Sequence, residues 1–198
     1  MNLLQSNISV PRLQRDYVQG INQNIIRPFI DDLMNGNETI DLNYIYGTQN
    51  ETHFQPIDGQ QRLTTLWLLR LCLSKVAEVE YDISLQYDAR EYANEFCKKL
   101  LKASVDDIQN PQLASWYLKS WNDDPSVVAM NSTIAVIWKY MPDNKKDALK
   151  ILNSLIERLQ YCYLPLGNDI NEDVYIKMNR RGVQLTAFEN LKSWLDKQ

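Results

Sequence analysis

Residues 58–69 read DGQQRLTTLWLL, a polar loop that leads straight into an apolar run. The glycine of the loop permits a tight turn and the close approach of a ligand to the backbone. The apolar run continues to about Val79 and predicts a helix from Leu63 that is apolar on nearly all sides; such a helix is buried in the middle of its domain. Just before the loop, His53–Ile57 predicts a strand. The stretch therefore predicts a strand, a turn that a ligand can reach and a central helix.

Signals for strands and helices occur on both sides of this stretch. Extended structure is expected at Ile8–Pro11, at Leu42–Tyr46 closed by Gly47, and at Gln160–Leu166, with a polar turn over Gln49–Thr52. Helices are expected from Pro28 to Asn35, from Asp88 to Ala103, from Asn110-Pro111, from Pro125, from Asn144 to Leu159, and from Thr186 to Lys197, where Thr186 and Glu189 form a capping box. These signals predict an α+β fold in which a small sheet carries the N-terminal loops and a larger, mostly helical portion packs on it.

Composition excludes several classes of function. The three cysteines, Cys72, Cys97 and Cys162, are far apart and odd in number, which favours reduced thiols in a cytoplasm over a disulfide framework or a zinc site. His53 is the only histidine, so a His-based nuclease centre cannot be assembled from this chain. No apolar run reaches the roughly 18 residues that cross a bilayer. A net charge of −4 gives no whole-domain attraction to nucleic acid.

The Asp58 loop is the strongest candidate for chemistry. Free N–H groups and the positive dipole end of the following helix favour a phosphate. Arg62 supplies a planar fork for phosphate oxygens, and Gln60 or Gln61 could bond a base, a sugar or an attacking water. Asp58 could bind a metal ion or ribose hydroxyls. The first turns of the helix also carry two hydroxyls, those of Thr64 and Thr65.

A second interpretation of this loop needs no ligand. Asp58 could be the N-cap of the helix and Gln61 its reciprocal partner in a capping-box arrangement. The loop is also not a Walker loop, because no Gly-Lys-Ser/Thr follows, and it is not a dinucleotide fingerprint. Spacing alone leaves both interpretations open.

Two further segments could contribute to the same site. Residues 11–17 read PRLQRDY and place two arginines, a glutamine and an aromatic ring in a short extended segment; the structural alternative is a surface segment anchored by Leu13 and Tyr17. Residues 175–182 read YIKMNRRG, from which Asn179 and Arg181 could reach the pocket; the alternative is a short helix closed by Gly182.

Four strings occur in one order along the chain: QRDY at 14–17, YIYG at 44–47, DGQQRLTTLWLL at 58–69 and YIKMNRRGVQLTAFENLKSWL at 175–195. In this order they resemble the N-terminal domain family of GmrSD-type, modification-dependent restriction systems. The resemblance covers nearly the whole chain. It implies a core similar to the ParB and sulfiredoxin folds. Residues 1–80 are then expected to form the nucleotide-loop region, and residues 81–198 a helical region that returns a strand and the NRRG segment to the same core, in one continuous domain cut from a longer protein.

The resemblance also implies a function. Members bind a nucleoside triphosphate at the DGQQR loop, several hydrolyse it, and this activity is coupled to DNA cleavage by a His-Asn-His nuclease domain that is C-terminal or on a partner chain. The catalytic residues are then expected to be Asp58, Gln60, Gln61 and Arg62, with Asp58 also holding Mg²⁺. The nucleotide-binding residues are expected to be Gly59, Thr64, Thr65, Gln14, Arg15, Tyr17, Asn179, Arg181 and Gly182.

Three functions therefore compete at this stage. The first is a Mg²⁺-dependent nucleotide hydrolase or switch that controls a nuclease domain absent from this chain. The second is a DNA-recognition module that holds backbone phosphates with the same arginines and performs no hydrolysis; its binding would weaken steeply with salt. The third is a structural scaffold for a C-terminal domain, which would keep every activity in an Arg62→Ala variant.

Overall fold

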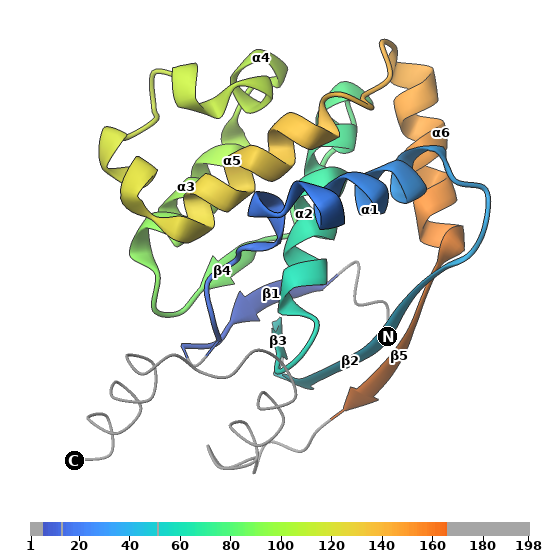
Figure 1. The fold of residues 1–198 in the computed structure, drawn as a ribbon, viewed down its shortest axis with the longest axis horizontal. Helices are drawn as coiled ribbons and strands as arrows, with labels where there is room; N and C mark the ends of the chain where they lie inside the picture. The colour runs from blue at the N-terminus through green and yellow to red at the C-terminus, as the bar shows by residue number, and fades with distance from the viewer. Residues whose placement is uncertain (1–5, 13, 51, 166–198) are drawn as a thin grey trace.

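The computed structural model describes residues 6–12, 14–50 and 52–165. Their centre is a five-stranded mixed sheet in the order β4-β1-β3-β2-β5 (Figure 1). The strands are β1 (Asn7–Val10), β2 (Ile40–Gln49), β3 (His53–Pro56), β4 (Leu85–Tyr87) and β5 (Leu159–Pro165). β2 and β3 form an antiparallel hairpin, and the other three neighbouring pairs are parallel. The sheet therefore unites strands from the first and the last parts of the described chain.

Six α-helices in the described residues pack on one side of this sheet (Figure 1). They are α1 (Gln23–Asn35), α2 (Gln60–Val76), α3 (Glu91–Lys102), α4 (Val105–Gln109), α5 (Pro125–Ile137) and α6 (Lys145–Arg158). The described residues also contain three short 3-10 helices: η2 (Gln19–Ile21) before α1, and η3 (Pro111–Leu113) and η4 (Lys119–Asp123) between α4 and α5. The predicted α+β class is confirmed. None of the described helices is both long and apolar enough to cross a membrane.

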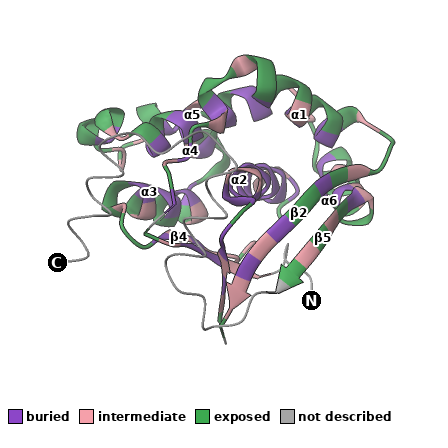
Figure 2. Ribbon diagram, turned by 60° about the horizontal axis from the view of Figure 1, so that its bottom comes forward, coloured by how far each residue is buried: buried purple, intermediate pink, exposed green. Residues whose placement is uncertain are grey.

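Helix α2 is the core of the molecule, as its apolar run predicts. Every residue from Leu63 to Ser74 is buried, on all sides of the helix (Figure 2). The helix ends at Val76, earlier than the predicted Val79, because the chain turns back at Glu78, whose φ is 53°. The central helix thus fixes the loop that precedes it, since that loop is tied to the most buried element of the fold.

Some predicted boundaries are wrong. Helix α1 begins at Gln23, where the Asn22 side chain accepts a hydrogen bond from the Asn24 N–H, and Pro28 lies inside the helix. Strand β2 runs through Gly47 to Gln49. Asn110-Pro111 opens only the three-residue η3, because the Asn110 side chain caps no N–H group.

Other helix signals are confirmed. α5 begins at Pro125 after the Asp124 side chain caps it, and α6 begins after a capping Asn144. Strand β4 and helix α4 were not predicted, because each is too short to show a hydrophobic period. The expected helix from Thr186 to Lys197 and its capping box lie outside the described residues.

The three thiols differ sharply in exposure, and this gives a first testable prediction. Cys72 and Cys97 are buried, whereas Cys162 on β5 is exposed. Burial raises the pKa of the Cys72 thiol to about 12 and also raises that of Cys97. Because the thiolate is the reactive form, we expect a disulfide reagent to modify one thiol in the native protein and three after unfolding. Rapid modification of more than one thiol in the native protein would contradict the packing of α2 and α3.

Candidate functional site

Helix α2 begins at Gly59 in an unusual conformation. Gly59 is its N-cap with φ 88°, in the left-handed region, and no side chain caps the helix. Asp58 does not cap it either: its Oδ1 accepts from the neighbouring Gly59 N–H at 2.7 Å. The capping-box interpretation is therefore wrong. A capping side chain belongs to an N-cap residue in extended conformation, whereas the N-cap of α2 is Gly59, which has no side chain and a left-handed conformation. The N–H groups of the first turn of α2 have no side-chain acceptor within the described residues.

The two glutamines of the motif hold the N-terminal segment against α2. The Gln60 side chain donates to the Arg15 carbonyl at 2.8 Å. The Gln61 side chain donates to the Asp16 carbonyl at 2.8 Å, and its oxygen accepts from the N–H groups of Val18 and Gln19 at 2.9 and 3.1 Å. Both side chains are thus engaged with a backbone more than 40 residues away in sequence, a partnership that local spacing could not reveal.

The Arg62 side chain bonds to backbone carbonyls of β2 that no described strand pairs with on the β3 edge. Its guanidinium donates to the carbonyls of Leu42 and Tyr44, the latter at 3.0 Å. β3 pairs with β2 only at Gly47–Gln49, so beyond that point no described strand pairs with β2 on its β3 edge, while β5 pairs with its other edge. Arg62 also lies 3.7 Å from the Asp58 carboxylate, which is more than half exposed. An ion pair this exposed adds little to the stability of the fold. Arg62 therefore fixes β2 and borders the Asp58 loop at once.

The segment PRLQRDY is brought to the same place. The Gln14 side chain is buried and donates to the Ile57 carbonyl at 2.6 Å, just before the loop. Arg15 is exposed, while its carbonyl is fixed by Gln60. Asp16 forms an ion pair with Arg90, which also donates to the Gln14 carbonyl at 2.6 Å. Sequence reasoning missed Arg90, because no local pattern signals a partner 74 residues away.

Tyr17 and the two threonines form a buried hydroxyl network. The Tyr17 hydroxyl lies 2.8 Å from Thr65 Oγ1 and 2.7 Å from Thr133 Oγ1. Thr64 Oγ1 lies 2.9 Å from the hydroxyl of Tyr87 on β4. Burial raises the pKa of Tyr17 to about 12, against the opposing effect of its two hydrogen bonds. These hydroxyls are buried and bond to one another, so they stabilise the packing around the loop and do not face a ligand.

A Tyr17→Phe variant tests this network. We expect it to lower the free energy of unfolding by about 1–2 kcal/mol, because Thr65 and Thr133 each lose a buried partner. Chemical denaturation measures the effect. The control is Tyr92→Phe, because Tyr92 is an exposed tyrosine of α3. Equal stabilities for the two variants would show that the network contributes nothing.

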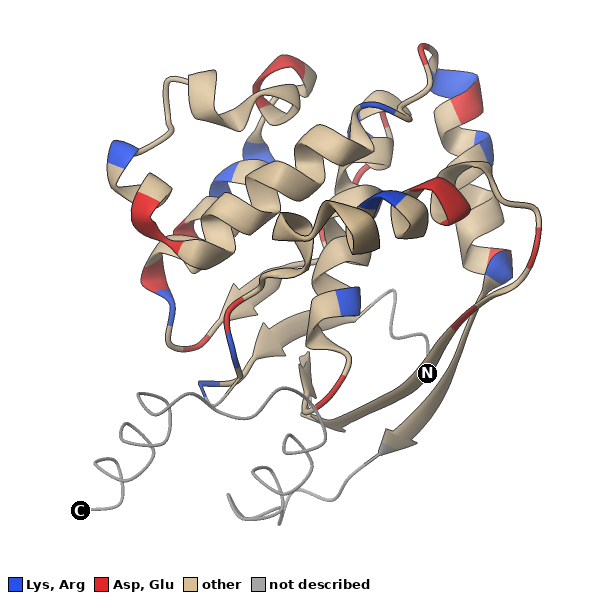
Figure 3. Cartoon of the chain, viewed as in Figure 1, with Lys and Arg blue, Asp and Glu red and all other residues tan. Residues whose placement is uncertain are grey.

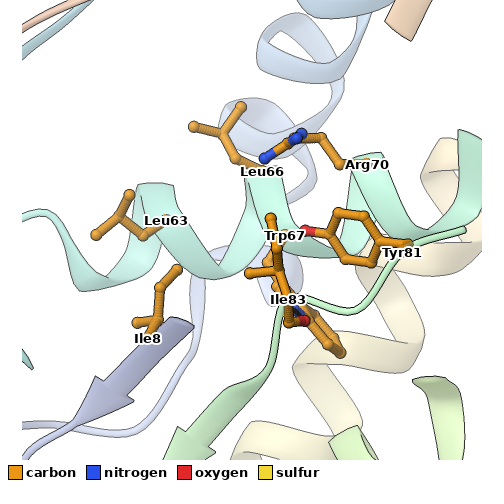
Figure 4. A pocket seen from close by; sticks show the side chains of 7 residues that line it. All are labelled: Ile8, Leu63, Leu66, Trp67, Arg70, Tyr81 and Ile83. Atoms are coloured by element: carbon orange, nitrogen blue, oxygen red, sulfur yellow. Dashed lines mark hydrogen bonds between the residues drawn. The ribbon is translucent and has the colours of Figure 1, made fainter. Parts of the chain in front are cut away.

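A small pocket elsewhere along α2 has a different character. Its lining comprises Ile8, Leu63, Leu66, Trp67, Arg70, Tyr81 and Ile83 (Figure 4). The Arg70 guanidinium lies 5.4 Å from the centre of the Tyr81 ring, and the Trp67 indole donates to the Ile83 carbonyl. The lining is mostly apolar, with the Arg70 guanidinium, the Tyr81 hydroxyl and a Trp67 N–H that is already bonded to Ile83, so this pocket offers few donors for a phosphate chain.

Part of the predicted site is not tested by these contacts. Asn179, Arg181 and Gly182 lie outside the described residues. Within residues 6–12, 14–50 and 52–165, no three His, Cys, Asp or Glu side chains are grouped to hold a metal ion. The described part of the site therefore consists of Asp58, the uncapped start of α2, Arg62 beside it, and the exposed Arg15, whose backbone carbonyl is held by Gln60.

The fold and this loop define an α+β domain in which a glycine turn, uncapped and bordered by arginine, leads into a central helix that is buried from Leu63 to Ser74. Comparison with known families gives the same answer as the motifs. The chain belongs to the family described as the GmrSD restriction endonuclease, N-terminal domain, whose model matches residues 1–195. No curated protein and no solved structure gives a significant match. Membership of this family implies that the nuclease part of the restriction endonuclease lies outside this N-terminal domain.

Proposed function

We propose that this domain binds a nucleoside triphosphate at the start of α2 and that this binding regulates the nuclease part of the restriction endonuclease. The observation that carries the proposal is the first turn of α2, whose N–H groups are left without a side-chain cap behind Gly59. Such a turn combines free donors with the positive end of a helix dipole, which together suit a phosphate group.

The residues around this turn fit a triphosphate. A Cβ at Gly59 would lie 3.2 Å from Ile45 on one side and 3.5 Å from an Arg62 nitrogen on the other. The glycine therefore keeps the backbone accessible beside a guanidinium. Arg15, exposed and anchored through Gln60, would supply a second cation from the N-terminal segment. In this proposal an acidic chain would bring two arginines to one helix start, as a local anion site requires.

Asp58 fits the role of a magnesium ligand. Its side chain is 58% exposed, and its carboxylate already faces Arg62. Mg²⁺ in nucleotide sites is usually held by one or two carboxylates together with phosphates and water, so a protein cage is not needed. When bound, the ion would neutralise part of the charge on the phosphates. Asp58 would hold it, and Arg62 and the α2 N–H groups would stabilise charge that develops on phosphate oxygens.

The glutamines have a different part in this proposal. Gln60 and Gln61 were predicted to be catalytic, yet both amides are bonded to the backbone of residues 15–19. We assign them as positioning residues that keep Arg15 beside the first turn of α2. Gln14, Thr64, Thr65 and Tyr17 support the same arrangement through buried hydrogen bonds.

Thermal stability in the presence of ATP, GTP, CTP or UTP with Mg²⁺ tests the proposal. A ligand that binds only the folded state stabilises it by about 2.7 kcal/mol at a hundredfold excess over Kd. We expect a nucleotide to raise the melting temperature of the wild type and of Arg27→Ala, an exposed arginine on α1, but much less that of Arg15→Ala. Phosphate release measured on the same samples shows whether the nucleotide is hydrolysed.

Two outcomes would contradict the proposal. One is the absence of any nucleotide effect on the wild type, with and without DNA. The other is stabilisation by duplex DNA alone with a steep dependence on salt, which would favour a DNA-recognition module. In Figure 3, basic and acidic residues are interspersed over the described elements in this view, consistent with the net charge of −4 and unlike a basic binding face.

A further inference from the structure

Strand β5 forms one edge of the sheet within the described residues. It is the last strand in the order β4-β1-β3-β2-β5 and pairs there with β2 alone (Figure 1). An edge strand directs a row of N–H and C=O groups away from its neighbour, where another strand can pair with them. The opposite edge, β4, has three residues and is followed directly by Asp88, whereas β5 has seven residues. β5 is therefore the edge that is long enough to pair with a further strand.

The sequence of β5 lacks the features that usually prevent pairing at an edge. The strand reads LQYCYLP, contains no charged residue and has its proline at the last position. The bulge in the β2–β5 pair places its extra residue on β2, between Asp41 and Tyr44, so β5 itself is unbroken. Charges, prolines and bulges within an edge strand are the common protections against pairing with another chain. β5 carries none of them before its final residue.

Exposed side chains of this edge are largely apolar. Cys162 is exposed, and Leu164 is 45% exposed. Ile156, in the last turn of α6 and three residues before the strand, is 40% exposed. Tyr161 and Tyr163 lie on the other face of the strand, where they are half-buried against the core. A partner strand at this edge would therefore bury apolar side chains on both faces of the sheet.

From these observations we propose that β5 pairs antiparallel with β5 of a second copy of this chain, about a two-fold axis at Cys162. Cys162 is the middle residue of the strand. In a two-fold pairing, a charged residue near the axis meets the same charge of the other copy, so a strand without charges suits a second copy. The pairing places Tyr161 opposite Tyr163 of the second copy, and aromatic cross-strand pairs are stabilising. It also places Gln160 opposite Leu164.

Sedimentation equilibrium of the 198-residue chain in a reducing buffer, over a range of concentrations, tests this pairing. We expect the mass to rise with concentration from that of one chain to that of two. Cys162→Lys would set two like charges opposite each other, so we expect it to raise the dimer Kd by at least about tenfold. The matched control is Leu113→Lys, because Leu113 is 84% exposed on η3; this variant should dimerise as the wild type does.

A charge reversal tests the register. Cys162→Glu alone should dimerise as weakly as Cys162→Lys, whereas an equimolar mixture of the two should form a mixed dimer, because opposite charges then face each other. In the wild type, opposed residues of antiparallel strands have Cα atoms about 4.5–5.5 Å apart. A short bismaleimide should therefore link two copies through Cys162.

Three results would overturn the inference. The first is a wild type that keeps the mass of one chain at every concentration. The second is a dimer that Cys162→Lys does not weaken, since its interface would lie elsewhere. The third is the absence of mixed dimers from the Lys and Glu variants when the melting temperatures of both show that they are folded.

Discussion

An Arg62→Ala variant is expected to be less stable than the wild type by about 2–4 kcal/mol, the largest effect that we predict for an exposed or half-buried position. The guanidinium donates to two carbonyls, those of Leu42 and Tyr44, and alanine would leave both without a partner beside a strand edge. Hydrogen bonds from a charged donor are stronger than neutral ones, which is why the loss exceeds that of an ordinary surface side chain. Urea denaturation of both proteins measures the difference.

Arg62→Lys and Arg27→Ala complete this experiment. Lysine keeps the charge but not the planar fork, so we expect it to recover only part of the lost stability. Arg27 on α1 bonds only to Gln23, an exposed contact, and its removal is expected to be nearly neutral. If Arg62→Ala is as stable as Arg27→Ala, the guanidinium does not hold β2.

Gln61→Ala is expected to cost about 2–3 kcal/mol, since one amide makes three hydrogen bonds to the backbone of residues 16–19. The N–H groups of Val18 and Gln19 and the Asp16 carbonyl would all lose their partner. The N-terminal segment should then detach from α2. In limited proteolysis, the chain should therefore be cut near Arg15 faster than in the wild type. Chemical denaturation and timed proteolysis report the two consequences separately.

Gln109→Ala provides the comparison for Gln61, because Gln109 is exposed on α4. We expect it to match the wild type in both measurements. Gln61→Glu is a sharper probe: its carboxylate could accept from the two N–H groups but could not donate to the Asp16 carbonyl, so an intermediate stability is expected. Wild-type stability in Gln61→Ala would mean that the N-terminal segment is held by other contacts.

The sequence predicts the centre of this fold well and its connections less well. The apolar run after Asp58 correctly predicts a helix buried on all sides, because the pattern is long and leaves no polar face. Pro125 and Asn144 correctly mark helix starts, since Pro125 follows the capping Asp124 and Asn144 itself caps α6. Pro28 misleads because α1 is already capped by Asn22, six residues before Pro28.

The candidate site shows where local reasoning stops. Spacing makes Asp58 and Gln61 look like a capping box, yet the helix starts at a glycine with positive φ and Gln61 bonds to residues 16–19. Arg62 looks like a free phosphate ligand, yet two of its nitrogens are bonded to β2. In each case the partner comes from a distant part of the chain. Only the tertiary structure distinguishes the residues whose side chains hold the loop in place from those whose side chains are available to bind a ligand.

This separation bears on how the motif would work in a restriction endonuclease. Gln60, Gln61 and Arg62 tie three elements to one loop: the N-terminal segment, α2 and β2. A ligand that binds the first turn of α2 would therefore stabilise all three together. We expect such a change in rigidity, transmitted through these contacts, to be the means by which nucleotide binding reaches the nuclease part.

The central claim is that the nucleotide binds at the first turn of α2, and backbone NMR tests it most directly. Amide chemical shifts of the protein are recorded with and without ATP and Mg²⁺. We predict that the largest changes fall on the amides of residues 59–62, with a further change at Arg15. Unchanged amides at residues 59–62 in protein saturated with ATP would place the nucleotide elsewhere and contradict the account.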